Sequence, residues 1–249
     1  MARAFNAMQR RIADRIAERV QILAAISHDL QSPITRMRLR ADLLDDFALR
    51  QKFQSELTAM QTLIEQGIDL ARSAAPTCEA SAPTDVQALL ESLVYDYADS
   101  GDQVTLCRRI DGPVVTASHA LRRIMTNLTD NALKFGKDAE ISVERDVRGC
   151  VLIVVKDRGP GIPEPELEAV FAPFYRVEAS RSRENGGAGL GLAIASHLAI
   201  ALRGELRLTN RTGGGLEARL MLPCQTATSR RHVHYMCLCL PHDRDDPNS

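Results

Sequence analysis

The sequence predicts an α-helical hairpin followed by an α/β two-layer sandwich. Two observations predict these folds: apolar residues recur at heptad spacing between residues 5 and 73, and helices alternate with strands from residue 85 to residue 223. The segment between them, residues 75–84, is small, polar and proline-bearing, which is typical of a linker. A chain of 249 residues is long enough for two domains.

Two amphipathic runs predict the hairpin, because in both the apolar or small residues alternate at spacings of four and three. The first run consists of Ile16, Val20, Leu23, Ser27, Leu30, Ile34, Met37, Ala41 and Leu44. The second run consists of Phe53, Leu57, Met60, Ile64, Gly67 and Ala71. The polar pair Asp45-Asp46 separates the runs and predicts the turn. One hairpin cannot bury both of its apolar faces, so we expect a homodimeric four-helix bundle.

The second half of the chain has the pattern of a sandwich with a largely antiparallel sheet. Helices are expected over residues 85–98, 118–134 and 190–202. Strands are expected over residues 103–110, 139–146, 150–156, 204–210 and 215–222. Residues 224–249 lose all periodicity, which predicts a disordered tail.

Composition and charge exclude several classes of protein. The chain has 31 basic and 32 acidic residues, a formal net charge of -1, so it has no broad positive field for nucleic acid. Aromatic residues make up 4%, which disfavours base-stacking modules. No apolar stretch approaches the roughly 20 residues of a membrane-spanning helix. We therefore expect no nucleic-acid partner and no membrane span within these residues.

A histidine on the first predicted helix has unusual neighbours. His28 falls beside the packed positions, so it is expected to be exposed, and a lone exposed histidine is ordinarily a bland surface residue. Asp29, however, can keep a proton on one ring nitrogen and leave the other as a nucleophile. Pro33 lacks the N–H that the carbonyl of Asp29 would accept, which loosens the helix one turn beyond the histidine. These neighbours favour a chemical role for His28.

The predicted helix 118–134 carries polar residues at helical spacing. Asn127 and Asn131 are four residues apart and Lys134 is three further on, so all three point from one face. Amide oxygens can ligate Mg²⁺, and a lysine can neutralise phosphate. Taken alone, the same residues also fit an ordinary amphipathic helix.

Two glycine motifs follow. The apolar strand 151–155 leads into Asp157, whose carboxylate can accept a hydrogen bond from an adenine amino group, with Gly159 and Gly161 allowing close backbone approach. The second motif has glycines at alternate positions and opens an apolar helix, where backbone N–H groups can bind phosphate. It comprises Gly187, Gly189 and Gly191. The first motif alone also fits a tight turn, and neither matches a Walker or Rossmann pattern.

Taken together, these motifs resemble bacterial sensor histidine kinases. The sequence ISHDLQSP around His28 is similar to the phosphoacceptor box of that family. The order of the asparagine helix, the Asp157 motif, the string FAPFYR at residues 171–176 and the last glycine motif resembles the family's Bergerat-type ATP-binding domain. The resemblance extends over residues 20–223. It implies ATP-dependent autophosphorylation on His28, followed by transfer to an aspartate of a response-regulator receiver domain.

The resemblance also implies roles for individual residues. His28 corresponds to the phosphoacceptor, Asp29 to the adjacent acid, and Ser32 to a position that holds water for phosphatase activity. Asn131 corresponds to the Mg²⁺ ligand. The residues implied to bind ATP or its phosphates are Asn127, Asn131, Lys134, Asp157, Gly159, Gly161, Phe174, Arg176, Gly187, Gly189 and Gly191.

The resemblance further divides the chain. Residues 1–19 are similar to the end of a HAMP signalling linker, residues 20–74 to the dimerisation and phosphotransfer hairpin, and residues 85–223 to the catalytic ATP-binding domain. Family members usually lie in the bacterial inner membrane with this part facing the cytoplasm. We therefore expect a cytoplasmic portion whose membrane segments lie outside this chain.

Two alternatives to a kinase remain. The first is a Bergerat-fold ATPase that hydrolyses ATP; in gyrase-like ATPases a glutamate four residues before the Mg²⁺-binding asparagine activates water. Here that position is Asn127, which is a poor general base. The second is a non-catalytic signalling scaffold, which the intact Asn131, Asp157 and glycine motifs disfavour.

Overall fold

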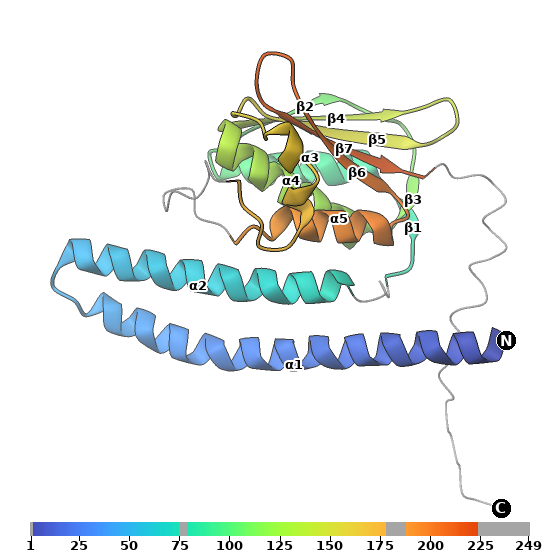
Figure 1. Cartoon of the computed structure of the whole chain (residues 1–249). Coiled ribbons are helices and arrows are strands. Elements are labelled where there is room, and N and C mark those ends of the chain that lie inside the picture. Colours follow the sequence, from blue (N-terminus) through green and yellow to red (C-terminus); the bar gives the residue numbers. More distant parts are fainter. Residues whose placement is uncertain (1, 75–78, 178–187, 224–249) are drawn as a thin grey trace, which may run out of the picture.

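The computed structural model describes residues 2–74, 79–177 and 188–223. In these residues a long helical hairpin lies alongside an α/β sandwich, and α2 is the hairpin helix that faces the sandwich (Figure 1). The predicted disordered tail, residues 224–249, lies outside the described residues. No helix in the described part of the chain has the length and apolar character needed to cross a membrane.

The hairpin consists of α1 (Ala2–Asp42) and α2 (Phe47–Ala74). Asp46 explains where the second helix begins: its Oδ1 accepts hydrogen bonds from the backbone N–H groups of Ala48 at 2.9 Å and Leu49 at 3.1 Å. Such a side-chain cap satisfies N–H groups that lack partners in the first helical turn. The polar pair predicted as the turn therefore also starts α2.

The heptad positions of α1 separate into two rows. Ser27, Ile34 and Ala41, seven residues apart, are buried at 4%, 6% and 5% exposure in the packing of α1 on α2. The alternate row, Leu23, Leu30 and Met37, remains 41–45% exposed. On α2, likewise, Leu57 is buried whereas Phe53 and Met60 are exposed. One apolar face of the hairpin is thus satisfied within the chain and the other is left uncovered.

The sandwich is built on a five-stranded sheet in the order β2-β4-β5-β7-β6. The strands are β2 (Gln103–Arg108), β4 (Asp138–Arg145), β5 (Val151–Lys156), β6 (Glu205–Asn210) and β7 (Leu216–Leu222). Strands β2 and β4 pair in parallel, and the three other neighbouring pairs are antiparallel. The predicted largely antiparallel sheet is confirmed.

Three helices cover one face of this sheet: α3 (Val86–Asp99), α4 (Ser118–Gly136) and α5 (Gly191–Ala201) (Figure 1). The apolar side of α4, including Leu121, Ile124 and Leu128, is buried against alternate residues of the strands, such as Ile141 and Ile153. Burial of one side of α4 leaves its other side for the polar residues at 127, 131 and 134. The fold is the predicted two-layer sandwich.

The linker expectation for residues 75–84 needs a correction at its end. Residues Ala82–Thr84 form β1, which pairs antiparallel with β3 (Val114–Thr116). Glu79 also belongs to the sandwich: its carboxylate accepts hydrogen bonds from the backbone N–H groups of His119 at 3.0 Å and Ala120 at 3.2 Å. Glu79 thus caps α4, whose own N-cap residue, Ala117, has no side-chain acceptor. A three-residue strand containing proline carries too little periodicity to be predicted.

Candidate nucleotide site and histidine helix

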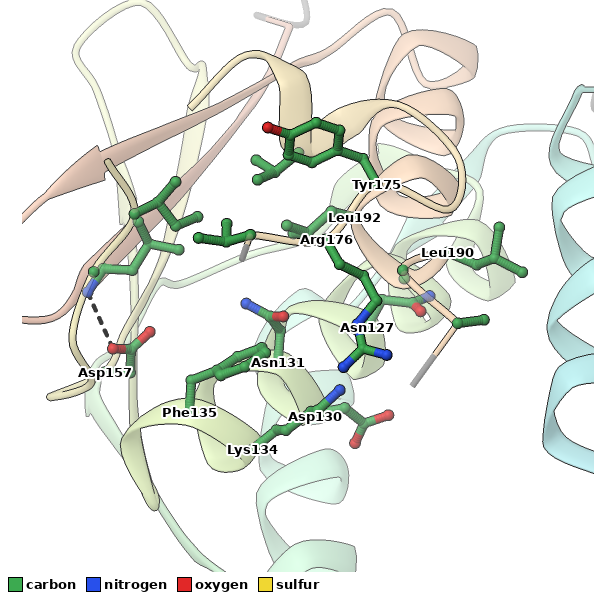
Figure 2. A pocket seen from close by; sticks show the side chains of 18 of the residues that line it. Asn127, Asp130, Asn131, Lys134, Phe135, Asp157, Tyr175, Arg176, Leu190 and Leu192 are labelled. Carbon is green, nitrogen blue, oxygen red and sulfur yellow. Dashed lines mark hydrogen bonds between the residues drawn. The ribbon is translucent and has the colours of Figure 1, made fainter. Parts of the chain in front are cut away.

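A cavity of about 430 Å³ lies between α4, the loop after β5 and the start of α5 (Figure 2). This volume is within the usual range of small-molecule sites. Eight residues predicted from the sequence line it: Asn127, Asn131, Lys134, Asp157, Gly161, Arg176, Gly189 and Gly191. The fold therefore brings together residues that are as far apart in the sequence as Asn127 and Gly191.

Asp157 is a buried acceptor at one side of the cavity. It is 5% exposed, and its Oδ1 accepts hydrogen bonds from the backbone N–H groups of Gly159 at 2.8 Å and Leu216 at 3.0 Å. Both of these bonds use Oδ1, so Oδ2 is the oxygen left for a ligand. A fixed carboxylate oxygen in an otherwise largely apolar part of a cavity suits a ligand with an amino group.

The turn between β6 and β7 holds the loop that carries Asp157. Asn210 binds Ile162 as a strand would: its Oδ1 accepts from the backbone N–H at 2.9 Å, and its Nδ2 donates to the carbonyl at 2.7 Å. Arg211 donates to the carbonyl of Asp157 at 2.5 Å. Gly215, with φ +100°, lies so close that a Cβ there would be 2.1 Å from the same carbonyl oxygen. These supports could not be predicted from the sequence, because nothing in their spacing links them to a loop 48 residues earlier.

Helix α4 supplies the polar floor of the cavity. The Nδ2 of Asn127 donates to the carbonyl of Arg123 at 2.8 Å, which leaves its Oδ1 as the available atom. Asn131 lies one turn further on, and Lys134 follows it on the same side (Figure 2). Burial, and then the positive charge of Arg176, lowers the pKa of the Lys134 ammonium below its usual value. Two cations kept close together in this way favour an anionic ligand.

Residues 175–177 and 188–190, which precede α5, line the side of the cavity opposite Asp157. Arg176 projects into the cavity across from Asp157 (Figure 2). Tyr175 lines it too, and its hydroxyl donates to Glu166 at 2.9 Å. Gly189, with φ +71°, is required here because a Cβ would lie 2.5 Å from the carbonyl oxygen of Tyr175. Since α5 begins at Gly191, its first N–H groups lie at this end of the cavity, where they favour phosphate.

Three predicted residues are placed differently from the eight that line the cavity. Gly159 lies behind the Asp157 loop, where a Cβ would meet the carbonyl oxygen of Phe135 at 2.8 Å. Phe174 is 68% exposed and lines a neighbouring cleft against α2 instead. Gly187 lies outside the described residues.

Two further polar residues, neither of them predicted from the sequence, also line the cavity. Asp130 accepts a hydrogen bond from the Tyr97 hydroxyl at 2.5 Å. Burial raises the pKa of the Asp130 carboxyl, the bond from Tyr97 opposes that rise, and the charge of Asp102 adds to it. The second residue, Gln66, comes from α2 of the hairpin. Asp130 directly precedes the predicted site residue Asn131, which could have indicated that it lines the cavity. No sequence feature indicated this for Gln66.

His28 and its neighbours lie outside this cavity, on α1. The side chains of His28 and Asp29 are 82% and 85% exposed, and Nδ1 of the histidine is 3.5 Å from Oδ1 of the acid. Ser32 is exposed one turn later. Pro33 stands inside α1, and the helix continues past it to Asp42. The structure thus presents a histidine–acid pair to solvent on a continuous helix.

Known proteins are similar to this chain in sequence. Residues 116–226 match the family described as histidine kinase-, DNA gyrase B- and HSP90-like ATPases. The chain is 40% identical over 223 residues to the sensor histidine kinase GtrS of Pseudomonas aeruginosa, covering 90% of this chain and 46% of GtrS. It is 32% identical over 219 residues to the sensor protein RstB of Escherichia coli, covering 85% of this chain and 50% of RstB. The chain spans about half the length of these curated relatives.

Solved structures share the fold. Full-length ShkA in complex with AMPPNP matches with a TM-score of 0.67 at 24% identity, covering 83% of this chain and 46% of ShkA. The Acinetobacter baumannii histidine kinase AdeS matches with a TM-score of 0.59 at 20% identity, covering 80% of this chain and 98% of AdeS.

The sandwich is therefore an ATP-binding domain of the histidine kinase, gyrase and HSP90 class. The chain as a whole is similar to part of the sensor histidine kinase GtrS and of the sensor protein RstB, and the predicted resemblance to sensor histidine kinases and the predicted Bergerat fold are confirmed.

Proposed function

We propose that this chain is the kinase portion of a two-component sensor: it transfers the γ-phosphoryl group of ATP to His28 and then to an aspartate of a response-regulator receiver domain. The observation that carries this proposal is the combination, in one chain, of a cavity with a buried acceptor and two cations and of an exposed histidine–acid pair. A hydrolase needs only the first of these two features.

The cavity supports one orientation of ATP. The adenine amino group donates to Oδ2 of Asp157, and Gly161 lets the loop backbone lie against the base. The phosphates then extend toward Lys134, Arg176 and the first N–H groups of α5, because these are the positive groups across the cavity (Figure 2).

The amide oxygens on α4 fit a magnesium ion. Mg²⁺ prefers oxygen ligands and usually keeps several from phosphate and water. Because the Nδ2 of Asn127 is engaged by Arg123, its Oδ1 remains to support the ion, and we assign the direct contact to Asn131. When bound, the ion neutralises phosphate charge as the phosphoryl group leaves.

At His28 the ring nitrogen Nε2 attacks the γ-phosphorus with its lone pair. The bond from that phosphorus to the β–γ bridging oxygen breaks, and the electron pair leaves with ADP. Asp29, 3.5 Å from Nδ1, favours the tautomer with the proton on Nδ1 and stabilises the positive ring that forms. High exposure of His28 lets it reach both an ATP-binding domain and a receiver domain.

The uncovered apolar row of the hairpin supports a homodimer. Leu23, Leu30 and Met37 on α1 and Phe53 and Met60 on α2 are all more than 40% exposed. A second copy of the hairpin would cover these residues in a four-helix bundle. We retain the assignment of residues 20–74 as the dimerisation and phosphotransfer unit and of residues 85–223 as the catalytic unit.

Three further expectations remain part of this proposal. Ser32, one turn after His28, is placed to hold a water molecule beside the phosphorylated ring, which supports phosphatase activity toward the regulator. Residues 1–19 are assigned to the end of a HAMP-like linker. The chain is assigned to the cytoplasmic side of a membrane receptor.

Labelling with γ-³²P-ATP tests the proposal. We expect label that is labile in acid and stable in alkali, and its complete loss in His28→Gln because glutamine has no nucleophilic ring nitrogen. The matched control is His119→Gln, which changes another exposed histidine and should label normally. Label that persists in His28→Gln would contradict the assignment, and steady phosphate release at an unchanged rate in that variant would favour a hydrolase.

A further inference from the structure

Gln66 is a residue of the hairpin that lines the nucleotide cavity of the sandwich. It lies on α2, far in sequence from the α4 and α5 residues around it. Its Oε1 is buried and has no hydrogen-bond partner among the described residues. Buried polar groups are rarely left without a partner, so an unpaired one that lines a cavity calls for an explanation, and a bound ligand is one.

The cavity lining shows which end of the nucleotide Gln66 faces. Gln66, Arg176 and Ala188 line both the nucleotide cavity and the neighbouring cleft against α2. Arg176 lies across the cavity from Asp157 (Figure 2). Gln66 is therefore at the cationic, phosphate end of the cavity and not at the adenine end.

An ion pair holds α2 in the position that brings Gln66 to the cavity. Asp69, three residues after Gln66 and on the same side of the helix, has its Oδ1 2.9 Å from Nη2 of Arg123 on α4. The carbonyl of Arg123 in turn accepts the side-chain hydrogen bond of Asn127. Docking of the hairpin is thus linked, through one residue of α4, to the polar floor of the cavity.

We propose that Gln66 is a phosphate-binding residue that the hairpin supplies to the nucleotide site. Rotation of its amide about χ3 exchanges the oxygen and nitrogen positions at little cost, since Oε1 has no hydrogen-bond partner among the described residues. The amide N–H then donates to an oxygen of the β- or γ-phosphate. Nucleotide affinity consequently depends on whether the hairpin is docked. This inference rests on the proposed ATP-binding function and extends it to a residue outside the ATP-binding domain.

Calorimetric titration of the full chain with ATP, ADP and adenosine tests the inference. Gln66→Met keeps the length and packing of the side chain and removes its donors. We expect about tenfold weaker binding of ATP, the loss typical of one hydrogen bond to a charged group, and unchanged binding of adenosine. ADP binding should weaken equally if the bonded oxygen is on the β-phosphate and should not change if it is on the γ-phosphate. Gln66→Glu should weaken ATP binding further, because it places a negative charge beside the phosphates. The matched control is Gln61→Met on the same helix, whose amide bonds Glu65 and Arg38 outside the cavity.

Charge reversal tests the role of docking. Asp69→Arg should weaken ATP binding about as much as Gln66→Met, and the double exchange Asp69→Arg with Arg123→Asp should restore it. In the Gln66→Met background, Asp69→Arg should add little. Unchanged ATP affinity in Gln66→Met, or an equal loss for adenosine, overturns the inference and leaves the kinase proposal standing. A wild-type chain that binds no ATP overturns both.

Discussion

The nucleotide cavity and the histidine helix differ in how they position their functional side chains. Asp157 is buried, and the backbone N–H groups of Gly159 in the loop after β5 and of Leu216 at the start of β7 fix one of its oxygens. His28 is 82% exposed, and the acid beside it, Asp29, lies on the same helix with its Oδ1 3.5 Å from Nδ1 of the histidine. Under the proposed function, this difference means that the fold preorganises the nucleotide cavity, whereas it leaves the proposed phosphoacceptor His28 accessible to two successive partners. Substitutions in the two regions should therefore fail in different ways.

The largest effect is expected where the cavity depends on backbone packing. Gly215→Ala places a Cβ 2.1 Å from the carbonyl oxygen of Asp157 at a positive φ, so we expect a loss of about 3–5 kcal/mol in the free energy of unfolding, together with loss of ATP binding. Gly213 has a similar φ of +102° but nothing within 4 Å of a Cβ. Gly213→Ala should thus lose only about 1–2 kcal/mol and still bind ATP. Urea unfolding and calorimetry measure both; equal losses in the two variants would contradict the role of the close approach.

A smaller and purely kinetic effect is expected on the histidine helix. Asp29→Asn removes the charge that stabilises the imidazole ring during attack, so we expect autophosphorylation to slow about a hundredfold. Because the side chain is 85% exposed, the free energy of unfolding should change by less than about 0.5 kcal/mol, and ATP affinity should not change. Asp42→Asn removes the same charge from the end of the same helix, so it is the matched control and should leave autophosphorylation unchanged. A parallel loss of ATP affinity in Asp29→Asn would show that the two regions are not separate.

The same contrast explains what the sequence could reveal. Asn127, Asn131 and Lys134 were found because helical spacing alone brings them to one face, and Asp157 because it ends a buried apolar strand. A chemical role for His28 could be predicted because the residues that indicate it, Asp29 and Pro33, lie close to it in the sequence. The position of Gln66 in the cavity could not be predicted, because it depends on how α2 docks on the sandwich. No local sequence pattern encodes that docking.

The residues that support the Asp157 loop could not be predicted from the sequence for a related reason. Asn210 acts through a side chain that imitates strand pairing with Ile162, and its type and position resemble any strand end. Glu79 was assigned to a linker because capping of α4 requires knowing that the linker returns to that helix. Sequence periodicity thus predicts the helices and strands of the site, but it does not predict long-range contacts made by single polar residues.

The smallest expected effect concerns pH and tests whether the cavity is electrostatically tuned. Burial and Arg176 lower the pKa of Lys134, so between that lowered pKa and the value of the unfolded chain the folded protein holds fewer protons than the unfolded one. Without nucleotide, the destabilising contribution of Lys134 should therefore diminish as pH rises through this alkaline window. ATP affinity should change in the opposite direction and fall by up to about tenfold, because the neutral amine attracts phosphate less.

Lys134→Arg separates this effect from general alkaline change. The guanidinium stays protonated throughout, so the variant should bind ATP with little dependence on pH over the same window. Lys52→Arg, on an exposed position of α2, is the matched control and should retain the wild-type decline. Calorimetric titrations at successive pH values provide the measurement. An identical decline in Lys134→Arg would mean that Lys134 does not set the charge at the phosphate end, and the assignment would pass to Arg176 and the first N–H groups of α5.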